Sequence, residues 1–271
     1  EMDLFARYAL QLTYPPNPIA NLDNSLSNRM RNAYDVYNND VNDTLTTCNG
    51  CHAIDPARGR FGTDGTMAIE GGGVEEDMKI PHLQNMYQKV GMFARNTQVR
   101  GFSNLGDQIR GFGYDNSGSA GSISNFLGED VFDLTMQERA MLEELSLSAP
   151  AKLNPVVGQQ VTVTPANRSR TDVRNRLELL VARALVTSPR PECELVAATV
   201  IDGHAVGWVM NREQGFVPSD RNLDAAALNT LLDRALKASR SATFTCVPPG
   251  NGTRIGIDRD LDGETDFSDS N

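Results

Sequence analysis

The sequence lacks any apolar run long enough to cross a bilayer, and it is short of positive charge. Lys and Arg total 25 against 35 Asp and Glu, so the formal net charge is -10. This excess of negative charge disfavours nucleic acid and anionic lipid as partners. We therefore expect no membrane span, no nucleic-acid partner, and a protein partner whose surface is basic or neutral.

No charged segment followed by an apolar one opens the sequence at Glu1, so no secretory leader is recognisable. We expect either a processed mature chain or a piece of a longer chain or complex. The 271 residues are enough for two domains of ordinary size.

Cysteine and histidine are scarce, with four and three residues, and three of these seven residues stand in one short motif. The motif is Cys48-Asn49-Gly50-Cys51-His52, the attachment signature of c-type haem. On one helical turn both sulfurs and the imidazole emerge on the same face, so two thioethers can hold the haem edge while His52 reaches the iron. The alternatives are a disulfide, a thioredoxin-like redox pair or half of a zinc site. A zinc site needs two more ligands, and a redox pair does not need the adjacent histidine.

The second axial ligand of such a haem is predicted to be Met92. It follows a glycine that ends a predicted helix, so its sulfur can face the open side of the iron. His82 is the alternative, and Met67 and Met78 are further candidates. Met86 lies on the predicted core face of its helix, where a methionine is expected to pack.

The pattern along the chain changes at Pro150 and Pro155. We expect a mainly α, loop-rich cytochrome c domain followed by a small α+β domain. The expected divisions are an N-terminal helix and Pro-rich linker (1–19), the cytochrome domain (20–150), an α+β domain (151–257) and an acidic tail (258–271). Periodicity and turn signals predict helices at 2–12, 25–38, 81–95, 135–147, 171–185 and 224–238, and strands at 194–201, 205–210, 242–247 and 253–257.

Four stretches together resemble the haem region of bacterial proteins related to the di-haem cytochrome c peroxidases: YPPNPIANLDNSLS, CNGCHAIDPARGRFGTDG, KIPHLQNMYQKVGMF and GFGYDNSGSAGSISNFL. The resemblance covers roughly residues 10–147. It implies that Pro81, Leu83 and Asn85 belong to a segment preceding the distal ligand, which falls on Met92, while Gln84 stands where the family has arginine. The family's second loop motif appears at 115–119 without its histidine.

Members of that family use two haems, whereas this sequence has one attachment motif. The resemblance therefore implies electron transfer rather than peroxide chemistry, and no catalytic residue is assigned. The alternatives are a peroxidase- or oxygenase-like enzyme and a cytochrome subunit or module of a larger redox complex.

The acidic tail at 258–269 has carboxylates at loop positions 1, 3, 5, 9 and 12 and glycine at position 6. This is the ligand order of an EF-hand-type calcium loop, and it resembles the loops of dockerins and thrombospondin type 3 repeats. The alternative is a solvated acidic tail. The predicted calcium ligands are Asp258, Asp260, Asp262, Glu264 through its carbonyl, Asp266 and Asp269.

Cys193 and Cys246 fall in β-like segments of the second half and are predicted to form a disulfide, with two buried thiols as the alternative. A covalent haem, a calcium loop of extracellular type and a disulfide all favour an oxidising compartment. We therefore expect a periplasmic or extracellular bacterial protein with one haem c and one calcium ion.

Overall fold

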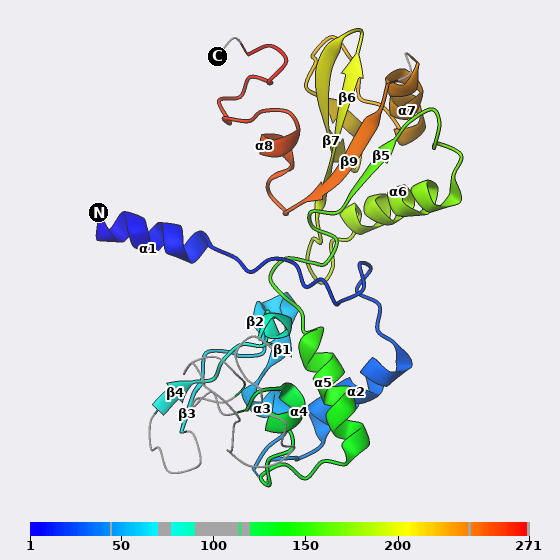
Figure 1. Ribbon diagram of the computed structural model, residues 1–271. Coiled ribbons are helices and arrows are strands. Elements are labelled where there is room, and N and C mark those ends of the chain that lie inside the picture. The colour runs from blue at the N-terminus through cyan, green and yellow to red at the C-terminus, as the bar shows by residue number, and fades with distance from the viewer. Residues whose placement is uncertain (44, 70–76, 90–113, 115–119, 238–239, 270–271) are drawn as a thin grey trace. The chain divides into compact units, whose positions relative to one another are not determined.

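The computed structural model describes residues 1–43, 45–69, 77–89, 114, 120–237 and 240–269 (Figure 1). The chain forms two compact units, Glu1–Pro155 and Val156–Asn271. Among the described residues, no helix combines the length and apolarity needed to cross a membrane.

The first unit is built on two helices whose apolar faces pack together, α2 (Asn28–Asn39) and α5 (Met136–Leu147). Helix α5 begins with a capping box, in which the Thr135 side chain accepts from the amide of Glu138 and the Glu138 carboxylate accepts from that of Thr135. The other elements are α1 (Met2–Gln11), α3 (Cys48–Cys51), β1 (Ile54–Asp55), η1 (Pro56–Arg58), β2 (Arg60–Phe61), β3 (Met67–Ile69), β4 (Asp77–Lys79), η2 (Met86–Gln88) and α4 (Ile123–Phe126).

The segment after α1 is fastened to the end of α5 by one buried side chain. The amide of Asn17 donates to the carbonyls of Leu147 and Ala149 at 2.9 and 3.0 Å. These carbonyls lie at and just beyond the last turn of α5, where helices lack internal donors. Residues 17 and 149 are thereby held together, whereas α1 itself buries no residue.

The second unit contains a five-stranded antiparallel sheet in the order β5-β9-β6-β7-β8. Its strands are β5 (Gln160–Val163), β6 (Glu194–Ile201), β7 (His204–Asn211), β8 (Gly215–Pro218) and β9 (Ala242–Val247). Helices α6 (Thr171–Ala184) and α7 (Leu228–Leu236) pack against one face, and the short helix α8 (Gly252–Gly256) contacts β6 and β7 (Figure 1).

The core of this unit lies between the sheet and the helices α6 and α7. Phe244 on β9 and Trp208 on β7 are completely buried there. The indole N–H of Trp208 donates to the Thr199 hydroxyl at 2.9 Å, so its polar atom is satisfied inside the core. The predicted disulfide between Cys193 and Cys246 is confirmed and ties β9 to the residue before β6.

The expectation of a mainly α cytochrome domain with a small α+β appendage is wrong as a fold class. The chain is about 33% helix and 18% strand and contains a five-stranded antiparallel sheet, which makes it an α+β fold. One cause is local. Within the predicted helix 81–95, Asn85 adopts a positive φ of 68°, and in the part that is described only the single 3-10 turn Met86–Gln88 forms.

Candidate haem and calcium sites

Helix α3 presents the CxxCH motif as a single capped turn. The Thr47 hydroxyl accepts a hydrogen bond from the amide of Gly50 at 3.1 Å, which satisfies one of the free donors at the helix start. Upstream, the Asp43 carboxylate accepts from the amides of Leu45 and Thr46 at 3.1 and 2.7 Å. The chain therefore enters the motif along a fixed path.

Both cysteines of the motif are free thiols and are partly buried. Burial raises the pKa of the Cys48 and Cys51 thiols, and the negative charge of Asp43 raises the pKa of both further. Cysteines that work in redox pairs have a lowered thiol pKa instead. The pKa shift of these thiols is thus opposite in direction to that of a reactive redox pair.

The imidazole of His52 is oriented by two backbone carbonyls. Its Nδ1 atom lies 3.1 Å from the carbonyl oxygen of Gly62 and 3.0 Å from that of Pro81. Both partners are acceptors, so the proton belongs on Nδ1 and the lone pair on Nε2. Burial lowers the pKa of His52, which keeps the ring neutral. A metal-ligating histidine is held in this way, with its second ring nitrogen donating to a carbonyl.

Two further contacts hold the frame around His52. The Tyr37 hydroxyl on α2 donates to the His52 carbonyl, and Tyr37 is only 4% exposed. The amide of Leu83 donates to the carbonyl of Phe61 at 2.8 Å, which joins the segment containing Pro81 to β2. The donor set of two free thiols and one oriented, neutral imidazole fits a covalently attached haem.

The predicted ligand Met92 lies outside the described residues. The alternative, His82, directly follows Pro81, whose carbonyl faces Nδ1 of His52, and its ring packs edge-on against Tyr14 at 4.9 Å between centroids. The backbone at residues 81–82 thus lies on the Nδ1 side of the His52 ring. His82 stays the alternative second ligand.

The other methionine candidates divide between core and surface. Met86 packs against the core of the first unit, in agreement with its interpretation as a packing residue. Met67 in β3 is 54% exposed and Met78 in β4 is partly buried. Neither strand contributes to the contacts around His52.

The acidic loop of the second unit brings three of its predicted ligands together. One carboxylate oxygen each from Asp258, Asp260 and Asp262 lies within 4.8 Å of the others. Asp258 is buried, and its oxygens accept from the amides of Leu261 and Gly263 at 2.7 and 3.2 Å. Gly263 has a φ of 92°, a conformation suited to glycine at the tight turn.

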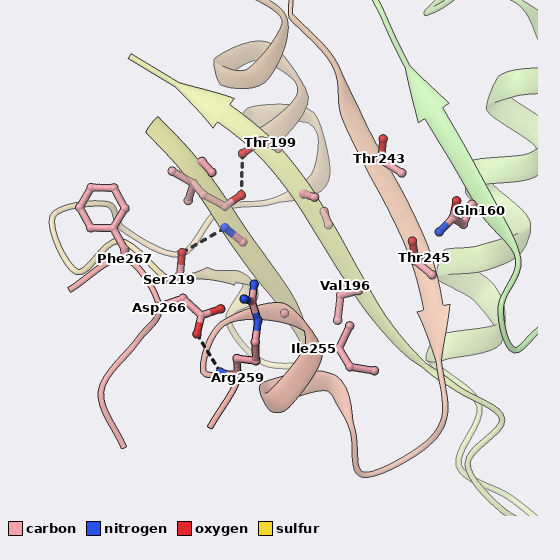
Figure 2. A pocket seen from close by; sticks show the side chains of 16 residues that line it. Gln160, Val196, Thr199, Ser219, Thr243, Thr245, Ile255, Arg259, Asp266 and Phe267 are labelled. Carbon is pink, nitrogen blue, oxygen red and sulfur yellow. Dashed lines mark hydrogen bonds between the residues drawn. The ribbon is translucent and has the colours of Figure 1, made fainter. Parts of the chain in front are cut away.

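The remaining predicted calcium ligands lie further along the same loop. Asp266 closes the loop by accepting from the amide of Arg259 at 2.8 Å, as Figure 2 shows. Glu264 is exposed, and Asp269 is partly buried in the turn that follows. The loop is therefore compact, with its first three carboxylates convergent.

A cavity of about 480 Å³ lies beside this loop, between the sheet and the C-terminal segment (Figure 2). Its walls include Gln160, Thr243 and Thr245 from the sheet and Ile255 and Arg259 from the other side. No cysteine or histidine is among its lining residues, and none of those residues belongs to the CxxCH motif.

Comparison of the chain with protein-family models, with curated proteins and with solved structures gave no match in any of the three. Functional inference therefore rests on the residues themselves. Sequence reasoning missed the residues that orient His52, namely Tyr37, Gly62 and Pro81 through their hydroxyl or carbonyl oxygens. Of these, Gly62 and Pro81 lie in stretches that carried the resemblance, whereas Tyr37 does not.

Proposed function

We propose that this protein is an exported c-type cytochrome that transfers single electrons through one covalently bound haem. The observation that supports this best is the orientation of His52. Its Nδ1 faces the carbonyls of Gly62 and Pro81, so the lone pair available to a metal belongs on Nε2, and two free thiols lie on the adjoining helical turn.

Haem bound at this site would supply reversible one-electron chemistry between ferrous and ferric iron. Cys48 and Cys51 would hold its edge through thioethers, and His52 would be the proximal ligand. The carbonyls of Gly62 and Pro81 orient the imidazole, and burial keeps it neutral. Met92 is our proposed second ligand.

The proposal is tested by co-expressing the chain with a c-type maturation system and staining for haem after denaturing electrophoresis. Cys48→Ala and Cys51→Ala each remove one thioether, so we expect weakened staining and a shifted haemochrome spectrum. The matched control is the double variant Cys193→Ala and Cys246→Ala, which removes the same residue type but should retain haem. Unchanged staining in both single variants would overturn the proposal.

The optical spectrum separates the proposal from its rivals. Two protein ligands produce low-spin iron, which suits a carrier, and Met92→Ala should convert it to a high-spin or alternatively ligated form of lower potential. His82→Ala should leave the spectrum unaltered. High-spin iron in the parent protein that reacts with peroxide would instead favour the enzyme.

We also propose that the loop beginning at Asp258 binds calcium. Three carboxylates within 4.8 Å repel one another strongly without a cation, so calcium should stabilise the second unit. The test is thermal unfolding with calcium and with chelator, for the parent and for Asp258→Ala with Asp262→Ala. Asp202→Asn with Glu213→Gln is the control, because it removes two exposed charges elsewhere in the same unit. Calcium-independent melting of the parent would reduce the loop to an acidic tail.

The proposed compartment is the periplasm or the extracellular space. It is supported by the Cys193–Cys246 disulfide, because such bonds persist where the surroundings are oxidising. Fractionation of the native cells, with haem staining of each fraction, tests it.

A further inference from the structure

Two turns of the first unit border the helix that carries the thiols. The amide of Asp133, in the turn at 129–133, donates to the carbonyl of Asn42 at 2.9 Å. Val41 forms an isolated β-bridge with Thr47, the residue before Cys48. The turns at 40–45 and 129–133 are thus joined to each other and to the start of α3.

Apolar side chains on these turns are exposed to an unusual degree. Leu45 is 89% exposed, Val41 60% and Val131 47%. Single exposed aliphatic residues are common, but three on two connected turns form a local apolar surface. Interfaces between proteins have such an apolar centre inside a polar rim.

The charged residues on these two turns are all acidic. Asp40, Asp130 and Asp133 are exposed there. The border of α3 is therefore acidic.

The sequence flanking these turns is also free of cationic residues. Residues 33–57 and residues 120–138 contain no lysine or arginine, although they hold four and four acidic residues respectively. Charge is thus segregated on the turns beside the motif, in a way that attracts a cationic surface and repels an anionic one.

We propose that these turns form a docking surface for a cationic redox protein, which we call the acidic-apolar patch (Asp40, Val41, Leu45, Asp130, Val131 and Asp133). The proposal rests on the proposed function, because docking here brings the partner next to the helix whose Cys48 and Cys51 would hold the haem. A second copy of this chain is disfavoured as the occupant, since it carries the same net charge of -10.

The first test measures electron transfer from the reduced, haem-loaded protein to hexaammineruthenium(III) by stopped flow. The haem iron goes from ferrous to ferric as the probe goes from Ru(III) to Ru(II). The patch variant is Asp40→Asn, Asp130→Asn and Asp133→Asn. We expect its rate to be about tenfold lower at low ionic strength, with the difference shrinking as salt screens the charges.

The matched control is Asp202→Asn, Glu213→Gln and Asp224→Asn, which changes the net charge equally through exposed residues of the second unit. Its rate with the ruthenium probe should stay close to that of the parent. If patch and control variants slow the reaction equally, only net charge matters and the docking surface is refuted.

The second test does not depend on electron transfer. A lysine-rich cytochrome c of net positive charge serves as protein probe and is coupled to the chain by a zero-length carbodiimide, with the linked carboxylates identified by mass spectrometry. We expect links at Asp40, Asp130 or Asp133, and weaker coupling in Leu45→Ser, which removes apolar surface but no charge. Links confined to other carboxylates would overturn the inference.

The two proposals fail differently. A parent protein without covalent haem would overturn the proposed function and the docking inference together. If the parent carries covalent haem but neither the cross-linking sites nor the electron-transfer rates depend on the acidic-apolar patch, only the docking inference is overturned.

Discussion

Replacing Gly62 by alanine tests the frame that orients His52. Gly62 has a φ of 93°, and its carbonyl is one of the two that face Nδ1 of His52. A Cβ at this position would lie 2.5 Å from the backbone nitrogen of Leu83. That nitrogen is held in place, because it donates a hydrogen bond to the carbonyl oxygen of Phe61 over an N–O distance of 2.8 Å. The loop must therefore move, and the Gly62 carbonyl with it.

The magnitude follows from two contributions. A left-handed backbone costs an alanine about 1–2 kcal/mol. Overlap with a packed neighbour adds about 1–3 kcal/mol. We expect Gly62→Ala to lower the free energy of unfolding by about 2–5 kcal/mol. Gly65→Ala is the matched control, since Gly65 has a φ of 92° but no atom within 4 Å of the added Cβ, so it should lose only the backbone contribution.

The assay is denaturant unfolding of the haem-loaded variants, combined with their visible spectra and reduction potentials. Gly62→Ala should also change the potential, because the hydrogen bond at Nδ1 tunes the basicity of the ligand nitrogen. Gly65→Ala should not. Equal stability losses in the two variants, with both potentials unchanged, would refute the reasoning that places Gly62 in the frame.

Three further predictions concern stability, each measured by denaturant unfolding. Cys193→Ala with Cys246→Ala opens a link across a sequence separation of 53 and should cost about 4 kcal/mol; an unchanged midpoint would contradict this. Trp208→Phe removes the hydrogen bond to Thr199 and leaves a small cavity, so we expect the free energy of unfolding to fall by about 2–4 kcal/mol. A decrease no larger than that of a surface substitution would contradict a stabilising role for the buried hydrogen bond. Hydrogen bonds from Thr135 lower the pKa of Glu138. The carboxylate therefore contributes to the free energy of unfolding above the unfolded-state pKa of about 4.3, and this contribution disappears as the pH falls through the folded-state pKa. The difference in free energy of unfolding between the parent and Glu138→Gln should therefore decrease between pH 6 and pH 3. A constant difference would show that the Glu138 cap does not stabilise the protein.

Elements with strong local signals could be predicted from the sequence. The capping box at Thr135 and Glu138 places the start of α5 correctly. The Asp202-Gly203 turn correctly separates β6 from β7, and both residues adopt the positive φ that such a turn requires. In each case residues close in the sequence determine the structure.

Elements that depend on tertiary partners were missed or assigned wrongly. The segment at 253–257 was predicted as a strand because of its apolar residues, but it forms helix α8, which packs on β6 and β7. Strand β5 has only four residues and pairs with β9 some 80 positions later, as in Gln160 with Thr245. No local pattern signals such a pairing.

The CxxCH motif shows the same division. Its spacing predicts that two thiols and an imidazole share one turn, and the structure has Cys48 and Cys51 in the turn of α3 with His52 as its C-cap. The orientation of His52, however, depends on carbonyls 10 and 29 residues away, at Gly62 and Pro81. A carbonyl belongs to every residue and leaves no trace in side-chain chemistry, so its role emerges only from the fold.

The Asn17 amide, which bridges to the carbonyls of Leu147 and Ala149, has a consequence for how this unit can be rearranged. It holds the two ends of the segment 17–149 next to each other. A segment whose ends meet can be excised, circularly permuted or inserted into a loop of another protein with little rearrangement of its interior. The first unit is thus suited to serve as a transplantable module, with Asn17 as the residue that any such transplant must retain.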